Sequence, residues 1–250
     1  MLIILSPAKT LDMSPAEANH SEPRLLEDTN QLARKLARLT KSELSELMSI
    51  SDKLTDLNYE RYKNFQESPI GKPALLAFKG DVYQDLDAAD FNDREFEFAN
   101  QQIRILSGLY GLLRPRDLMQ PYRLEMGTGL STRRGANLYD FWGDKITDLL
   151  NADLEAEGSG LLLNLASQEY FNSLRSDKIA GRILNIHFKE QRKGKYRIIS
   201  FNAKKARGKM ARLITLEGIT TADPLKDLVV NGYRYDDSLS EENDWVYVLN

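Results

Sequence analysis

A cation, a carboxylate and a phenol lie close together in the sequence at Lys79, Asp81 and Tyr83. They follow the apolar run Ala74–Phe78, whose composition predicts an inner strand. Side chains of these types can exchange protons with a substrate if folding buries them together, with Lys79 or the more distant Lys9 as base or anion binder and Asp81 as its carboxylate partner. They can equally form a surface ion pair beside the turn residue Gly80, and their spacing leaves both interpretations open.

Further polar side chains follow other predicted strands, at the position where α/β proteins often bind ligands. Ser6 and Lys9 follow the apolar run Leu2–Leu5, although Lys9 is equally compatible with a solvated loop. Ser167 follows Leu161–Leu165 and can cap a helix, whose N-terminus favours an anion. Two more residues share one face of a strand predicted over Tyr122–Met126. The complete set of pocket candidates is Ser6, Lys9, Lys79, Asp81, Tyr83, Arg123, Glu125 and Ser167.

A Gly-x-x-Gly pattern lies in the middle of the chain, within the segment Leu106–Leu112. It predicts a hairpin between two short helices. Gly108 and Gly111 can adopt positive φ and leave N–H groups uncovered for a phosphate, with Arg114 and Arg116 close by. The alternative is an ordinary helical hairpin whose glycines only permit close packing.

The charge of the chain is unevenly distributed. The whole chain has a net charge of −3, but residues 189–212 contain ten Lys or Arg and one acid, a local charge of +9. A basic hairpin tip followed by a basic helix is typical of contact with phosphate backbones. A solvated face balanced by the acidic tail is the alternative. The candidates on the predicted helix are Lys204, Lys205, Arg207 and Lys209.

The composition excludes several kinds of chemistry. The chain has no cysteine, which excludes disulfides, thiol nucleophiles and thiolate metal sites. Its two histidines, His20 and His187, are far apart in sequence, so we expect no metal site and no cofactor. The first residues lack the pattern of a signal peptide, and no apolar run is long enough for a membrane span. A cytoplasmic location without a membrane partner is the expectation.

Predicted helices and strands are interspersed, which indicates a mixed α/β class with an inner sheet covered by helices. We find no repeat and no linker, so we expect a single domain over residues 1–250. Within it we expect a helix-hairpin-helix element over about 93–120 and a basic hairpin and helix over about 182–217. Capping-box patterns at Thr40–Glu43 and Asn92–Glu95 predict two helix starts.

Several segments resemble the YaaA family of bacterial peroxide stress resistance proteins. In chain order they are Ser6–Thr10, Phe78–Tyr83, Leu106–Gly127, Leu138–Asp144, Asn164–Tyr170 and Ile199–Gly208. The resemblance implies a cytoplasmic protein that protects DNA and protein from hydrogen peroxide and is linked to lowered free intracellular iron. It further implies one mixed α/β domain of unusual topology, with a basic cleft and a DNA-associated helix-hairpin-helix element at Leu106–Leu118.

Two hypotheses from different classes follow. The favoured one is a DNA-binding stress protein that contacts the backbone and recognises shape more than sequence, through Gly108, Gly111, Arg114, Arg116, Lys204, Lys205, Arg207 and Lys209. The alternative is an enzyme that acts on a phosphorylated or nucleotide-like small molecule through the pocket candidates. The deciding observation is whether those candidates line one cavity or lie scattered over separate surfaces.

Overall fold

The apolar residues after Met1 form the central strand of the sheet in this computed structural model, which describes residues 1–16 and 18–250. Strand β1 (Leu2–Leu5) is fully buried and pairs in parallel with β3 (Ile103–Ser107) and β6 (Leu161–Asn164). Burial on both faces explains why every position of β1 is apolar. The predicted strand at Leu2–Leu5 is therefore confirmed.

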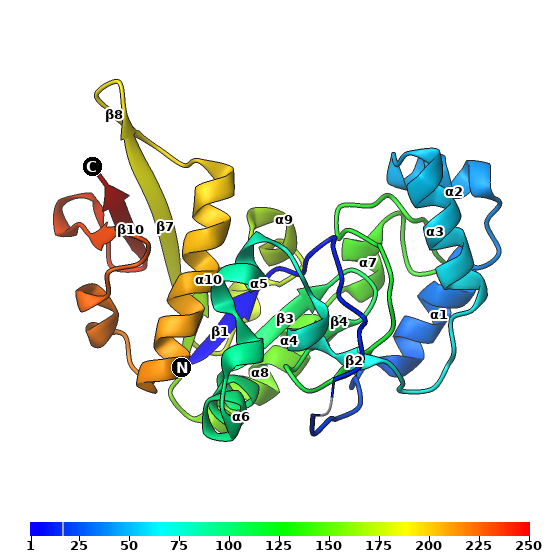
Figure 1. The fold of residues 1–250 in the computed structure, drawn as a ribbon, viewed down its shortest axis with the longest axis horizontal. Coiled ribbons are helices and arrows are strands. Elements are labelled where there is room, and N and C mark those ends of the chain that lie inside the picture. Colours follow the sequence, from blue (N-terminus) through cyan, green and yellow to red (C-terminus); the bar gives the residue numbers. More distant parts are fainter. Residues whose placement is uncertain (17) are drawn as a thin grey trace.

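The main sheet has eight strands and is mostly parallel (Figure 1). Its order is β4 (Gly111–Leu113), β3, β1, β6, β7 (Arg182–Arg192), β10 (Asp244–Leu249) and β9 (Arg234–Tyr235), with β8 (Lys195–Arg197) paired to β7. Strands β4, β8 and β9 are antiparallel to their neighbours. A separate short ladder joins β2 (Lys72–Pro73) to β5 (Leu118–Met119).

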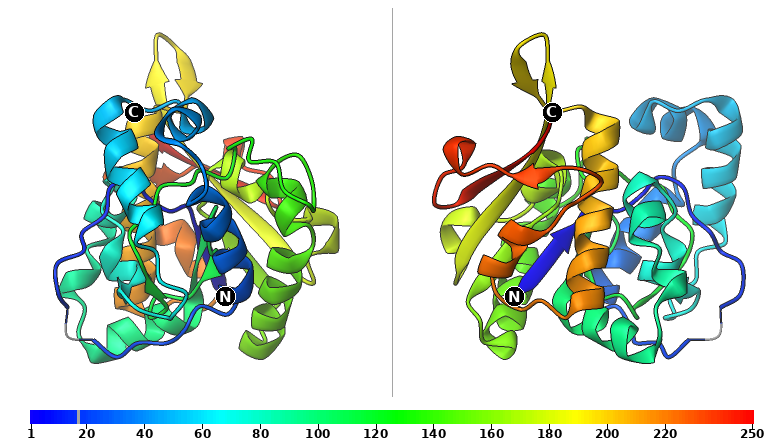
Figure 2. Two further views of the ribbon diagram at one scale, coloured as in Figure 1. Left: turned by 90° about the vertical axis from the view of Figure 1, so that its right-hand side faces the viewer. Right: turned by 60° about the vertical axis from the view of Figure 1, so that its left-hand side comes forward.

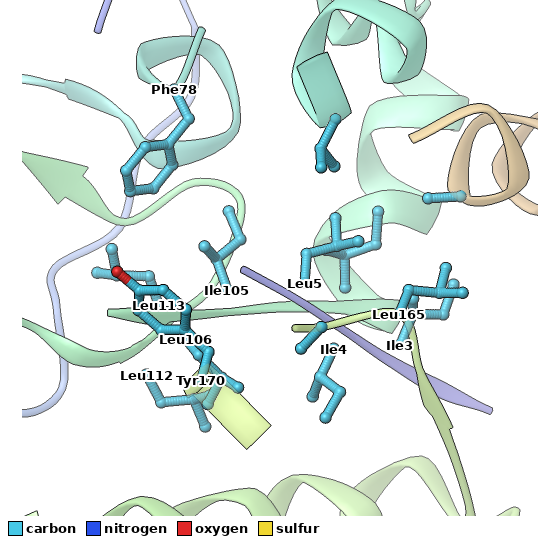
Figure 3. Close-up of a cluster of buried hydrophobic side chains, with 14 of the residues drawn as sticks. Ile3, Ile4, Leu5, Phe78, Ile105, Leu106, Leu112, Leu113, Leu165 and Tyr170 are labelled. Atoms are coloured by element: carbon cyan, nitrogen blue, oxygen red, sulfur yellow. The ribbon is translucent and has the colours of Figure 1, made fainter. Parts of the chain in front are cut away.

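Helices cover the sheet on both faces, and buried aliphatic side chains fill the space between the layers (Figure 3). Helices α5, α6 and α10 lie together on one side, and α8 packs against β1 and β4 from the other. The α-helices are α1 (Leu26–Leu36), α2 (Lys41–Met48), α3 (Asp52–Lys63), α4 (Ala74–Ala77), α5 (Asp81–Leu86), α6 (Asp93–Gln102), α7 (Leu138–Trp142), α8 (Lys145–Glu157), α9 (Gln168–Phe171) and α10 (Ser200–Glu217). The 3-10 helices are η1 (Ala88–Asp90), η2 (Ser176–Lys178), η3 (Asp223–Asp227) and η4 (Asp237–Leu239). The expected class, a mixed α/β fold with an inner sheet, is confirmed.

Local sequence signals fix several helix starts. Thr40 and Glu43 form a capping box at the start of α2, and Asn92 and Glu95 form one at α6, as predicted. Helix α10 begins at Ser200, before the cap expected at Asn202. Asn202 instead donates a hydrogen bond of 2.5 Å to the buried carboxylate of Glu190, which ties the first turn of α10 to β7.

The predicted helix-hairpin-helix element over 93–120 is not present; helix α6 and the β-hairpin β3–β4 stand there instead. The alternating run Ile103–Ser107 is fully buried and pairs with β1, so tertiary pairing decides its conformation. Gly108 is buried with its carbonyl accepting from Trp142 Nε1, and an added Cβ would lie 2.3 Å from the Leu124 oxygen. Gly111 has φ +69° and packs against Trp142. Both glycines therefore serve close packing.

Two other expected elements differ from the structure. The run Ala74–Phe78 contains helix α4 rather than an inner strand, and Tyr122–Met126 is irregular. Short apolar runs fit a buried helix as well as a buried strand, which is why composition did not separate them.

Strands β7 and β8 form a hairpin that extends beyond the body of the protein (Figure 2). The α2–α3 pair lies at the opposite end of the long axis (Figure 1). The segment that follows β1 lies between these two projections (Figure 1). Segments from the first and the second half of the sequence, among them α5 and α10, lie next to each other in this middle region.

Helix α10 approaches α5 through Gly208. A Cβ placed on Gly208 would lie 1.8 Å from the carbonyl oxygen of Val82, which is inside any permissible contact distance. The helix backbone therefore rests directly on the backbone of α5, and only glycine fits at this position.

We predict that Gly208→Ala destabilises the protein by about 2 kcal/mol or more, because α10 must move away from α5. This loss exceeds the roughly 1 kcal/mol by which Ala is the better helix former. Chemical denaturation measures the difference. Gly129→Ala is the matched control, since nothing lies within 4 Å of its added Cβ, and it should be near neutral. Equal stabilities for the two variants would contradict the close packing.

Candidate functional site

A cavity of about 530 Å³ lies at the carboxyl ends of β1 and β6. These strands are parallel neighbours, but the chain leaves β1 toward β3 on one side and leaves β6 toward β7 on the other. Such a reversal opens a crevice at the strand ends, where open α/β sheets bind their ligands. Its walls come from the loop after β1, α5, the segment after β5, the turn into α9, and α10.

All eight pocket candidates line this one cavity. They are Ser6, Lys9, Lys79, Asp81, Tyr83, Arg123, Glu125 and Ser167. The loops that carry them are joined by hydrogen bonds around Ser6. Its Oγ accepts from the Ser167 amide at 2.8 Å, and its carbonyl accepts from the Tyr83 hydroxyl at 2.8 Å. The candidates therefore line one cavity and are not scattered over separate surfaces.

The cavity lining carries excess positive charge. Five cationic side chains face three carboxylates: Lys9, Lys79, Arg123, Lys204 and Arg207 against Asp81, Glu125 and Glu169. Glu125 is shared, at 2.7 Å from Lys9 Nζ and 3.0 Å from an Arg123 nitrogen. Lys79 Nζ lies 3.6 Å from Asp12, outside the lining. The pocket is therefore suited to an anionic ligand.

Three buried tyrosines form the floor of the cavity: Tyr83, Tyr122 and Tyr170. Burial raises the pKa of each phenol above its ordinary value, so all three stay protonated at neutral pH. The Tyr83 hydroxyl is further committed to the Ser6 carbonyl. Tyr83 therefore acts as a hydrogen-bond donor that fixes the loop after β1.

The residues expected to contact DNA fall into four groups. Lys204 and Arg207 line the cavity, whereas Lys205 and Lys209 lie on α10 outside its lining. Lys205 lies over the exposed ring of Phe201, with Nζ 4.8 Å from the centroid. Gly108 and Gly111 are buried, so they offer no uncovered amides to a phosphate.

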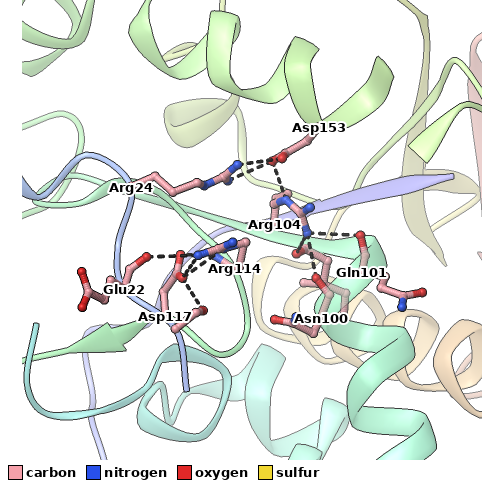
Figure 4. Close-up of polar contacts among 10 residues, drawn as sticks. Glu22, Arg24, Asn100, Gln101, Arg104, Arg114, Asp117 and Asp153 are labelled. Atoms are coloured by element: carbon pink, nitrogen blue, oxygen red, sulfur yellow. Dashed lines mark hydrogen bonds and ion pairs between the residues drawn. The ribbon is translucent and has the colours of Figure 1, made fainter. Parts of the chain in front are cut away.

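Arg114 and Arg116 lie away from the cavity. Strand β4 runs antiparallel to β3 and carries the chain back toward the amino ends of β1 and β3, opposite to the cavity. Arg114 bonds the buried Asp117 carboxylate at 2.8 Å and the Glu22 carbonyl (Figure 4). Arg116 pairs with Glu97 at 3.0 Å. Arg114 and Arg116 are thus not among the residues that line the cavity, whereas Lys204 and Arg207 of α10 are.

Sequence reasoning placed Lys204 and Arg207 on a DNA-contacting face and missed their position in the pocket. Their spacing of three residues puts them on one face of α10. Gly208, the neighbour of Arg207, was the available signal that this helix lies close to another element. Tyr122 was also missed as a pocket residue, since its segment was expected to form a strand.

Two kinds of feature are absent from the described ranges 1–16 and 18–250. No helix there is long and apolar enough to cross a membrane. No group of three or more His, Asp or Glu in those ranges is placed to hold a metal ion.

A comparison with protein families agrees with the resemblance seen in the sequence. The model of the family described as peroxide stress protein YaaA matches residues 1–239. The chain belongs to this family. Five of the six segments that carry the resemblance contribute side chains to the cavity lining; only Leu138–Asp144 does not. Even that segment reaches its edge, since the Tyr139 hydroxyl donates to the Glu169 carbonyl at 3.0 Å. The family's shared segments thus converge on the pocket.

We predict that Ser6→Ala lowers stability by about 1–2 kcal/mol, because it leaves the Ser167 amide without its acceptor. Thermal unfolding measures the loss. Ser14→Ala serves as the control, since Ser14 is exposed and bonds only to local partners and Lys72; it should change stability by less than about 0.5 kcal/mol. A Ser6→Ala protein as stable as the parent would show that the two loops are held by other contacts.

Proposed function

We propose that this peroxide stress protein acts by binding a phosphorylated or nucleotide-like small molecule in the pocket at the ends of β1 and β6. The observation that carries the proposal is the convergence of all eight candidates in one cavity with excess positive charge. A cavity of about 530 Å³ is in the size range of small-molecule sites, which span about 300–1,000 Å³.

The lining also supports recognition of more than charge. The phenol rings of Tyr83, Tyr122 and Tyr170 line the cavity and add apolar surface beside the cations. Nucleotide-like ligands combine an anionic group with an apolar ring, and this pocket offers a partner to each. The lowered free iron that the resemblance implies stays a proposal, and we propose that it follows from what the pocket binds.

We predict opposite effects from two pocket substitutions on affinity for nucleoside monophosphates, measured by calorimetry. Lys204→Gln removes a cation and should weaken binding about tenfold, whereas Glu125→Gln frees Lys9 and Arg123 and should strengthen it several-fold. Lys195→Gln, on the exposed hairpin, removes the same charge outside the pocket and should leave affinity unchanged. The proposal fails if no nucleoside monophosphate or sugar phosphate binds the parent protein at millimolar concentration.

We propose DNA binding as a second function, supported by a different observation. The β7–β8 hairpin projects from the body, and its Arg192, Lys193, Lys195 and Arg197 are exposed. They continue into Lys205 and Lys209 on α10, beside the exposed Phe201. Clustered cations with an exposed aromatic ring suit a nucleic-acid backbone. The glycine turn and Arg114 and Arg116 have no part in this version of the hypothesis.

For this second function, we predict that combined charge reversal at Lys205 and Lys209 weakens DNA binding. The slope of log affinity against log salt should fall by about 0.9 for each DNA phosphate that the variant no longer neutralises. Fluorescence anisotropy with duplex, bubble and single-stranded DNA over a salt series measures both quantities. Reversal at Lys53 and Lys63 on α3 makes the same net change elsewhere and should leave the slope intact. An unchanged slope in the α10 variant would count against DNA binding at this surface.

A further inference from the structure

Arg207 is a half-buried cation without a counterion. Its side chain lines the cavity, and its Nε atom is inaccessible to solvent. Within the part of the chain that the structure describes, its guanidinium makes no hydrogen bond and no ion pair. Burial lowers the pKa of Arg207, and no carboxylate opposes that effect.

Other arginines with a shielded Nε are different. Arg24, Arg116 and Arg123 share that feature, but each forms an ion pair through another guanidinium nitrogen. Their partners are Asp153 at 2.7 Å, Glu97 at 3.0 Å and Glu125 at 3.0 Å. Arg207 therefore differs from these three arginines, because their charges are balanced by carboxylates of the fold and its charge is not.

Shielding part of a charge from water without a partner is unfavourable, so the fold gains no stability from the buried, unpaired Nε of Arg207. Groups of this kind are retained where a ligand supplies the opposite charge. The position is also fixed, because the adjacent Gly208 presses α10 onto the Val82 carbonyl. The fold therefore holds the guanidinium at the cavity wall.

We propose that Arg207 and Lys204 form the phosphate-binding subsite of this pocket, an inference that rests on the proposed small-molecule function. The guanidinium presents a planar fork of donors that matches two phosphate oxygens, and an ammonium one turn earlier adds a point charge. Two adjacent cations favour a dianion over a monocarboxylate. The phosphate can belong to a free monoester or to a nucleic-acid strand, and both sources share this chemistry.

The test compares Arg207→Met and Arg207→Lys with the parent protein, using inorganic phosphate, AMP, adenosine and a single-stranded oligonucleotide as probes. Without a probe, Arg207→Met should unfold at the same or a higher temperature than the parent, since it removes an unpaired charge. Its affinity for AMP should fall at least about tenfold, and Arg207→Lys should lie between, since it keeps the charge but loses the fork. Adenosine should bind the parent and both variants alike. Arg38→Met, at an exposed position between α1 and α2, is the matched control.

The outcomes are distinguishable. A parent that binds AMP, with Arg207→Met binding it equally well, overturns the subsite and leaves the proposed function standing. A less stable Arg207→Met with unchanged AMP affinity assigns Arg207 a structural role and overturns the proposal too. If AMP does not bind but oligonucleotide affinity at fixed salt depends on Arg207 and not on Arg38, the small-molecule function fails and the subsite takes strand phosphates. If no phosphate source responds to Arg207, both fall.

Discussion

The contact on which the site depends is the backbone approach between α10 and α5 at Gly208. Helix α5 begins with Asp81 and carries Tyr83, and α10 carries Lys204 and Arg207. With the Gly208 Cα seated on the Val82 carbonyl, these two sets face each other across one cavity. A side chain at this position would separate the helices and widen the pocket. A residue without a side chain thus determines how the charged residues are arranged.

The second constraint is the parallel pairing of β1 with β6. Each residue of β1 is buried, so the strand itself has no polar chemistry to offer. The first polar side chain is that of Ser6, which directly follows the last residue of β1. Beyond the end of β1, the Ser6 hydroxyl and carbonyl connect its loop by hydrogen bonds to the loop after β6 and to α5. A rigid apolar core therefore positions a polar site directly at its edge.

The sequence predicted correctly those elements whose conformation is determined by strong local signals. The run Leu2–Leu5 and the capping boxes at Thr40 and Asn92 gave correct elements, because burial and caps act locally. The pocket candidates converged because Ser6 and Ser167 follow the parallel neighbours β1 and β6, and α5 and the segment 122–125 line the same cavity beside these strand ends. The prediction for the Gly108–Gly111 turn was wrong, since glycine serves positive φ, phosphate contact and close packing alike, and only the neighbours Leu124 and Trp142 distinguish these uses.

The density of basic residues identified a cationic segment but did not show on which surface each cation lies. The run 189–212 was recognised as basic, yet the helical period divides it between two surfaces, with Lys204 and Arg207 facing the cavity and Lys205 and Lys209 outside it. Both proposed functions therefore share α10, a rigid element within about a Debye length of each surface, roughly 8–10 Å in physiological salt. An anion held by Lys204 and Arg207 would reduce the positive potential along the outer face of the same helix. If both proposals hold, pocket occupancy and strand binding are electrostatically linked through the geometry of α10.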